Sequence, residues 1–121
     1  MNKQNKIRLY LAGKVTGLPE AEVEKKFTDA ETIYTELGFH VINPVKLIKD
    51  DGLHIGTWES IMKICLIMML ACDGVVLLHD WKDSKGAILE RDIAKRLDIP
   101  SRVLAMGGFR ITKVELRNEA K

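Results

Sequence analysis

The sequence has few of the features that mark membrane, secreted or metal-binding proteins. Its 121 residues include only two cysteines, Cys65 and Cys72, with no CxxC pair and no cluster of histidines and cysteines. The longest mostly apolar run, residues 61–78, is interrupted by a lysine, an aspartate and a glycine. We interpret this run as a buried helix followed by a buried strand rather than a membrane span. With no signal-peptide pattern either, we expect a cytoplasmic protein with reduced thiols, no metal and no membrane partner.

An excess of charge of one sign is also missing. Charged residues make up 30% of the chain, yet the formal net charge is only +2. A protein that binds a nucleic-acid polymer usually has a larger or more clustered basic excess, so we do not expect such a partner. The hydrophobic content of 46% suits one compact domain over residues 1–121, with a core at about 6–106 and a tail at 107–121.

Hydrophobic periodicity predicts strands and helices that alternate along the chain. The expected strands cover residues 6–13, 39–44, 74–80 and 102–106, and the expected helices cover 20–38, 58–71 and 85–97. Residues 45–57 are polar and contain glycine, which indicates a loop with at most one helical turn. The alternation predicts an α/β three-layer sandwich around a parallel sheet of four to five strands, flavodoxin/Rossmann-like in type.

Ligands of such sheets bind beyond the carboxyl ends of the strands, where the strand order reverses. The segment GKVTG, residues 13–17, follows the first strand. Its glycines allow the backbone to approach a ligand, the next helix offers amides to an anion, and Lys14 adds a positive charge. The alternative is a plain turn, which an isolated motif of this kind favours.

The segment DSKGAILE, residues 83–90, follows the third strand. Ser84 can cap the next helix, and its hydroxyl could also hold a phosphate or a sugar hydroxyl. Gly86 leaves room for a ligand, and Glu90 lies one turn deeper on the same helix face, where its carboxylate could face the cleft. The alternative is a surface Glu90 paired with Lys85 or Arg91, and the spacing favours neither.

Three side chains near the predicted cleft have two readings each. Trp81 could stack on a base or cover the edge of the core. Asn43 could bond a ligand, but Asn-Pro is a common start of a turn, which we favour. His79 could be a general acid, although a lone histidine is more often structural. Trp58 and Met62, one turn apart, are interpreted as packing.

Four motifs occur in order over residues 7–105: LYLAGKVTG, INP, W-x-x-x-M and CDGVVLLHDWKDSKGAILE-x-x-x-A. Together they resemble the nucleoside 2-deoxyribosyltransferase-like superfamily, and within it a small branch of unknown function. The resemblance implies a nucleoside or nucleoside 5′-monophosphate as substrate. It also implies cleavage or transfer of the N-glycosidic bond without a cofactor, and a homo-oligomer.

The resemblance also implies roles for individual residues. Glu90 would be the nucleophile that attacks the anomeric carbon of the sugar, and Tyr10 would lie beside it and position it. The sugar or its 5′-phosphate would be bound by Gly13, Lys14, Thr16, Gly17, Ser84 and Gly86.

The sequence departs from the pattern of the active enzymes at two positions. Lys14 replaces the usual proline, and a lysine would suit a phosphate. Cys65 stands where the active enzymes carry an aspartate, and a neutral thiol is a poor general acid. This departure favours the alternative of a nucleotide-binding module with little or no turnover, unless Asp73, Asp80 or Asp83 near the cleft substitutes. A third alternative is a structural or partner-binding domain with an empty cleft.

The helix expected over residues 58–71 is apolar nearly all round. One side of such a helix should pack on the sheet, and the other side needs a second covering surface. We therefore expect a homo-oligomer formed through this helix.

Overall fold

The computed structural model describes residues 6–51 and 56–104. Its sheet contains four parallel strands in the order β2-β1-β3-β4. The strands are β1 (Arg8–Ala12), β2 (His40–Ile42), β3 (Gly74–Leu78) and β4 (Ser101–Leu104). This order is that of the flavodoxin-like α/β fold, in which the chain runs outward from β1 in one direction and then crosses back to β3.

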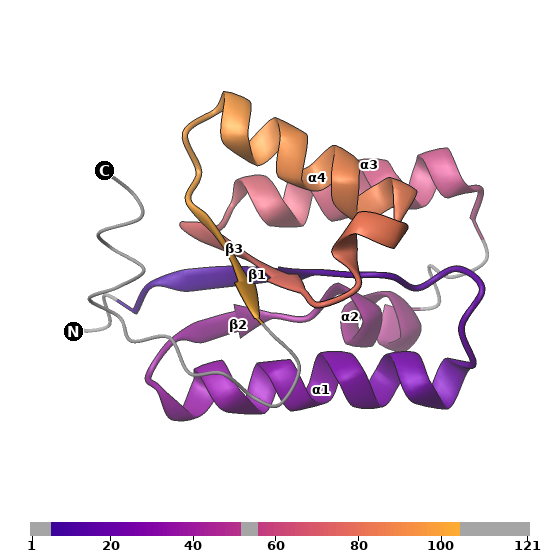
Figure 1. The fold of residues 1–121 in the computed structure, drawn as a ribbon, viewed down its shortest axis with the longest axis horizontal. Coiled ribbons are helices and arrows are strands. Elements are labelled where there is room, and N and C mark those ends of the chain that lie inside the picture. The colour runs from indigo at the N-terminus through magenta and orange to yellow at the C-terminus, as the bar shows by residue number, and fades with distance from the viewer. Residues whose placement is uncertain (1–5, 52–55, 105–121) are drawn as a thin grey trace.

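Helices cover both faces of the sheet, which gives three layers (Figure 1). One face carries α1 (Glu20–Glu36), and the other carries α3 (Trp58–Leu70) and α4 (Lys85–Arg96). A short 3₁₀ helix, η2 (Trp81–Asp83), links β3 to α4. The three-layer α/β prediction is therefore confirmed.

The alternation of side chains along β1 and β3 divides the core into two clusters. Leu9 and Leu11 pack with Phe27 and other α1 residues, whereas Tyr10 and Ala12 pack with residues of α3 and α4. All five residues of β3 are buried, as expected for a parallel strand covered on both faces. Tyr10 therefore points to the layer that contains α4, which decides where its hydroxyl can reach.

The cap predictions are confirmed at two helices. The Thr57 hydroxyl accepts a hydrogen bond from the Ser60 amide at the start of α3, and the Ser84 hydroxyl accepts one from the Ala87 amide at the start of α4. Each bond satisfies one of the amides that have no partner within the helix.

The loop prediction for residues 45–57 is wrong over its first half. Residues Pro44–Asp51 form α2, a helix of two turns. Pro44 occupies the first helical position, where its missing amide hydrogen is not needed, and the Asn43 side chain accepts a hydrogen bond from the Lys46 amide at 3.2 Å. Asn43-Pro44 therefore begins a helix instead of a turn.

Two other expectations concern the fourth strand and the possibility of a membrane-spanning helix. The expected fourth strand, residues 102–106, is observed as Ser101–Leu104, and its last two residues and the tail at 107–121 lie outside the described residues. Within the described residues, none of the helices has the length and apolar character needed to cross a bilayer.

Candidate functional site

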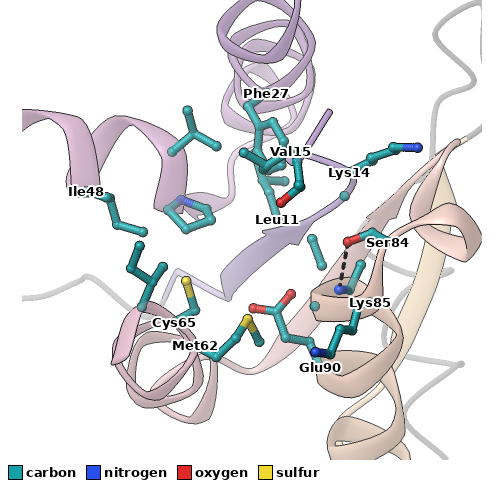
Figure 2. A pocket seen from close by; sticks show the side chains of 18 of the residues that line it. Leu11, Lys14, Val15, Phe27, Ile48, Met62, Cys65, Ser84, Lys85 and Glu90 are labelled. Carbon is teal, nitrogen blue, oxygen red and sulfur yellow. Dashed lines mark hydrogen bonds between the residues drawn. The ribbon is translucent and has the colours of Figure 1, made fainter. Parts of the chain in front are cut away.

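A cavity of about 720 Å³ opens at the carboxyl ends of β1 and β3. Its walls come from β1, the loop after β1, and the helices α1, α2, α3 and α4 (Figure 2). The two strands are the ones between which the strand order reverses, which is where ligands of open α/β sheets bind. The volume lies within the range of small-molecule sites in proteins.

A buried carboxyl group faces this cavity. Glu90 on α4 is only 5% exposed, and its side chain points into the space that Cys65 and Met62 also line (Figure 2). The Tyr10 hydroxyl donates a hydrogen bond to Glu90 Oε2, although the two residues are 80 positions apart in the sequence. The reading of Glu90 as a surface residue paired with Lys85 or Arg91 is therefore wrong.

The environment shifts the proton affinity of both partners. Burial raises the pKa of Glu90 to about 7, and the hydrogen bond from Tyr10 opposes that shift. Burial also raises the pKa of Tyr10 well above its ordinary value, and the negative charge of Glu90 adds to the effect. Tyr10 therefore stays a hydrogen-bond donor, while Glu90 exchanges its proton near neutral pH.

Cys65 on α3 is the third polar group at this point of the cavity. The residue is 7% exposed, and its thiol interacts with both Tyr10 and Glu90. Burial raises the pKa of this thiol to about 11, against the effect of its hydrogen bond with Tyr10. The group is consequently neutral at physiological pH and supplies no charge to the site.

Ser84 and Gly86, at the start of α4, line the cavity as well. The Ser84 hydroxyl keeps one lone pair and its proton after capping the helix, so the cap does not prevent contact with a ligand. A Cβ atom on Gly86 would lie 3.0 Å from the Met62 sulfur and 3.9 Å from Trp58 Nε1. The glycine thus allows α4 to pack closely against Met62 of α3.

The loop after β1 is fixed by an ion pair. Asp80, which follows β3, accepts a hydrogen bond from the Lys14 amide at 3.0 Å and forms an ion pair with Lys26. Lys26 also donates to the Lys14 carbonyl at 2.6 Å. Burial of Asp80 opposes ionisation, but these bonds from Lys26 and Lys14 outweigh it and lower the pKa of the carboxyl. The loop that carries Lys14 is therefore anchored to both β3 and α1.

The residues of the loop after β1 differ in whether they line the cavity. Gly13, Lys14 and Thr16 line the cavity, whereas Gly17 is not among the lining residues and occupies the left-handed region with φ of 87°. A Cβ atom on Gly13 would lie 2.9 Å from atoms of Leu78. Gly13 is thus required by the close packing of the loop on β3.

Three predicted residues lie away from the cavity wall. Asn43 is buried, caps α2 and donates a hydrogen bond to Glu31 at 3.1 Å. Trp81 packs against the edge of the core and lines a neighbouring groove. His79 is exposed at the end of β3 and does not line the cavity.

The three aspartates considered as substitutes for the missing carboxylate occupy different positions relative to the cavity. Asp73 accepts a hydrogen bond from the Arg8 amide, at the amino end of β1, so the expectation that it lies near the cleft is wrong. Asp80 lies at the correct end but is engaged by Lys26 and Lys14. Among the three, Asp83 lines the cavity.

Several lining residues were missed by sequence reasoning. Ile48 and Lys49 come from α2, which was not expected because the polar segment after Asn43 was interpreted as a loop. Trp58 and Met62 were interpreted as packing, although their one-turn spacing matches that of Gly86 and Glu90 and could have placed them opposite the same cavity. Lys85 lies with its ammonium 4.0 Å from the centre of the Trp58 ring.

The described residues contain no group of three or more histidine, cysteine, aspartate or glutamate side chains arranged to hold a metal ion. Besides the Tyr10–Glu90 pair, the cavity wall contains hydroxyls at Thr16 and Ser84 and charged side chains of both signs. The cationic residues are Lys14, Lys49 and Lys85, and the acidic residues are Glu20, Glu24 and Asp83. Lys49 and Glu24 form an ion pair with each other.

Comparison with known proteins assigns the chain to a family without assigning an activity. Residues 7–101 match the family described as a domain of unknown function, DUF4406, and the chain belongs to that family. Neither the curated proteins nor the solved structures give a significant match.

Proposed function

We propose that the protein cleaves or exchanges the N-glycosidic bond of a nucleoside or a nucleoside 5′-monophosphate, with Glu90 as nucleophile. The observation that carries the proposal is a buried carboxyl, held by the Tyr10 hydroxyl, that faces a cavity of about 720 Å³ at the switch point of the sheet. Carboxyl groups with raised pKa values in clefts are candidates for catalysis. The third alternative, an empty cleft with Glu90 in bulk solvent, lacks support because Glu90 is buried beside a cavity.

The proposed chemistry takes place in two displacements. A Glu90 carboxylate oxygen attacks the anomeric carbon, and the carbon–nitrogen bond breaks with its electron pair going to the base, which then takes a proton from solvent. Water, or a second base, attacks the same carbon in the next step, and the ester bond breaks with its electrons returning to Glu90. The proton of the attacking molecule leaves to solvent. Each step has an oxocarbenium-like transition state.

The residues around Glu90 have separate tasks in this proposal. Tyr10 orients the carboxylate and stabilises its negative charge through the hydrogen bond. Lys14, Thr16, Ser84 and Gly86 line the side of the cavity where the sugar and its 5′-phosphate would lie. Asn43, Gly17 and Trp81 do not line the cavity and are assigned no direct contact in this proposal.

The second candidate function is a nucleotide-binding module that does not turn its ligand over. The observation that favours it is Cys65, whose thiol is neutral and adds no acid to protonate the departing base. A Glu90 with a pKa of about 7 is also only partly ionised at neutral pH, which lowers the fraction of nucleophile.

A chromatographic assay for free base distinguishes the two candidates. A panel of nucleosides and nucleoside monophosphates is incubated with wild type, Glu90→Gln and the exposed control Glu22→Gln. Under the first proposal, Glu90→Gln lowers base release on the order of a thousandfold or more, and Glu22→Gln leaves it unchanged. No release from any substrate, together with a melting temperature raised by a monophosphate, supports the binding module.

The proposal also includes a cytoplasmic location and assembly through α3. Ile67 and Leu70 on this helix are 69% and 50% exposed, which provides the uncovered apolar surface that a second subunit would bury. Light scattering after size exclusion gives the mass of the assembly, and Ile67→Glu should reduce it to that of one chain.

A further inference from the structure

A second hollow lies next to the cavity that contains Glu90, on the outer side of η2 and α4. We name it the tryptophan groove, and its volume is about 560 Å³. Its wall includes the only two tryptophans of the chain and three cationic side chains. The residues used below are Trp58, Trp81, Lys82, Lys85 and Arg91.

The cations of the tryptophan groove lie over the indole rings. The Lys85 ammonium is 4.0 Å from the centre of the Trp58 ring, and Lys82 and Arg91 are 5.9 Å and 5.6 Å from the centre of the Trp81 ring. Such contacts are weak at exposed sites, so they are easily exchanged for contacts with a ligand.

In the part of the chain that the structure describes, the same cations have no anionic partner. Within residues 6–51 and 56–104, neither Lys82, Lys85 nor Arg91 forms an ion pair with a carboxylate. Asp92, the acidic residue in the groove wall, is bonded to Arg96 at 3.1 Å. The groove therefore combines aromatic surface with unneutralised positive charge, a combination that favours a flat ring carrying a negative group.

We infer that the tryptophan groove binds a free mononucleotide, with the base stacked on Trp81 and the phosphate held by Lys82 and Arg91. Trp81, Lys82 and Arg91 do not line the catalytic cavity. Trp58 and Lys85 line both spaces, so the two sites share a wall. The inference does not depend on the proposed glycosidic chemistry, because the residues that carry it are outside the cavity that contains Glu90.

The tryptophan content allows a direct measurement. The variant Trp58→Phe leaves Trp81 as the only tryptophan, so its fluorescence reports on the groove. We expect 5′-AMP to quench this fluorescence in a saturable way at low salt. Adenosine lacks the phosphate, and ribose 5-phosphate lacks the base. Each should bind at least about tenfold more weakly than 5′-AMP.

A surface variant tests the charges without altering the core. In the Trp58→Phe background, Lys82→Gln with Arg91→Gln should weaken 5′-AMP binding by about tenfold or more. The matched control, Lys63→Gln with Lys95→Gln, removes two exposed cations outside the groove and should leave binding unchanged. Calorimetry on the wild-type chain gives the same comparison if Trp58→Phe fails to fold.

Three results would overturn the inference. They are the absence of saturable quenching by 5′-AMP, equal binding by the groove variant and its control, or binding of a short single-stranded oligonucleotide without binding of the mononucleotide. The activity assay separates this failure from that of the proposed function. Glu90→Gln in the Trp58→Phe background should leave quenching of Trp81 by 5′-AMP intact, although Glu90→Gln abolishes base release. Lys82→Gln with Arg91→Gln, made in the chain that keeps Trp58, should leave base release unchanged, because neither residue lines the cavity that contains Glu90.

Discussion

Replacing Glu90 by glutamine should make the protein more stable at alkaline pH. The ordinary pKa of a glutamate is 4.5, and in the folded protein burial raises that of Glu90 to about 7. Between these two values the unfolded chain has lost the proton and the folded chain has kept it. Stability from this group is therefore fully present below pH 4.5 and is lost as the pH rises through about 7.

The size of the effect follows from the two pKa values. Each pH unit between them corresponds to about 1.36 kcal/mol, so ionisation of Glu90 costs about 3 kcal/mol in unfolding free energy once the pH exceeds 7. The side chain is 5% exposed, so solvent screening removes little of this cost. Glutamine has nearly the same shape, stays neutral, and can still accept the hydrogen bond from Tyr10 through its amide oxygen.

Urea unfolding of wild type and Glu90→Gln at pH 4.5 and pH 8.5 measures the effect. The stability difference between the two proteins should change by about 3 kcal/mol in favour of the variant, or roughly 10 °C in melting temperature. Contributions of other titrating groups cancel in this difference. Glu22→Gln gives the baseline for removing a solvated carboxylate. Parallel curves for Glu90→Gln and wild type would refute the reasoning, because they would place the pKa of Glu90 at its ordinary value.

Three further predictions concern the same site and the loop beside it. Base release by the wild type should rise about tenfold per pH unit below about 7 and then level off, because Glu90 must lose its proton to attack; a flat profile from pH 5 to 9 would contradict this. Gly13→Ala should lower the unfolding free energy by about 1–3 kcal/mol in urea titrations, because the new methyl group would lie 2.9 Å from Leu78; an unchanged midpoint would mean that the loop can shift. Asp80→Asn should cost about 2–3 kcal/mol by leaving Lys26 unpaired in a mostly buried position. Because the folded-state pKa of Asp80 is lowered, this difference should begin to shrink as the pH falls below 3.8, and a difference that does not decrease at all between pH 5 and pH 3 would count against the ion pair.

The fold was predictable because its signals are local and consistent. The unbroken Val-Val-Leu-Leu run of β3 indicated a strand covered on both faces, and the alternation of strands and helices left few topologies open. Ser84 was placed correctly because a cap fixes where α4 begins. The spacing from Gly86 fixed the helix face of Glu90 but did not decide between the cleft and the surface, and the structure decides for the cleft.

The α2 helix was missed because its composition outweighed its start signal. The segment after Asn43 is polar and runs into a glycine, which is typical of a loop. Asn43 and Pro44, however, are a favourable cap and first residue for a helix, and the structure uses them in that way. Ile48, which lines the cavity, could not be assigned to the site without that helix.

The error at Asp73 has a different origin. Asp73 precedes β3 and Asp80 follows it, so in a parallel sheet the two residues lie at opposite edges. The sequence contained this information, because only residues that follow a strand reach the ligand-binding edge. The Tyr10–Glu90 bond is the opposite case: it joins residues 80 positions apart, and no periodicity could have predicted the burial that sets the pKa of Glu90.

The presence of Glu90 requires a reason that the fold does not provide. An ionised carboxyl at this position costs about 3 kcal/mol, which is a large fraction of the net stability of a domain of this size. A glutamine would fit the same space and keep the bond from Tyr10 without that cost, and an aliphatic side chain would suit a wall that already includes Met62. Neither replacement could gain and lose a proton near neutral pH while it faces a cavity. The arrangement is therefore better explained by chemistry or charge recognition in the cavity than by packing. A Glu90→Gln variant that gains stability and loses base release would establish that Glu90 serves chemistry. A gain in stability without base release from the wild type would favour charge recognition.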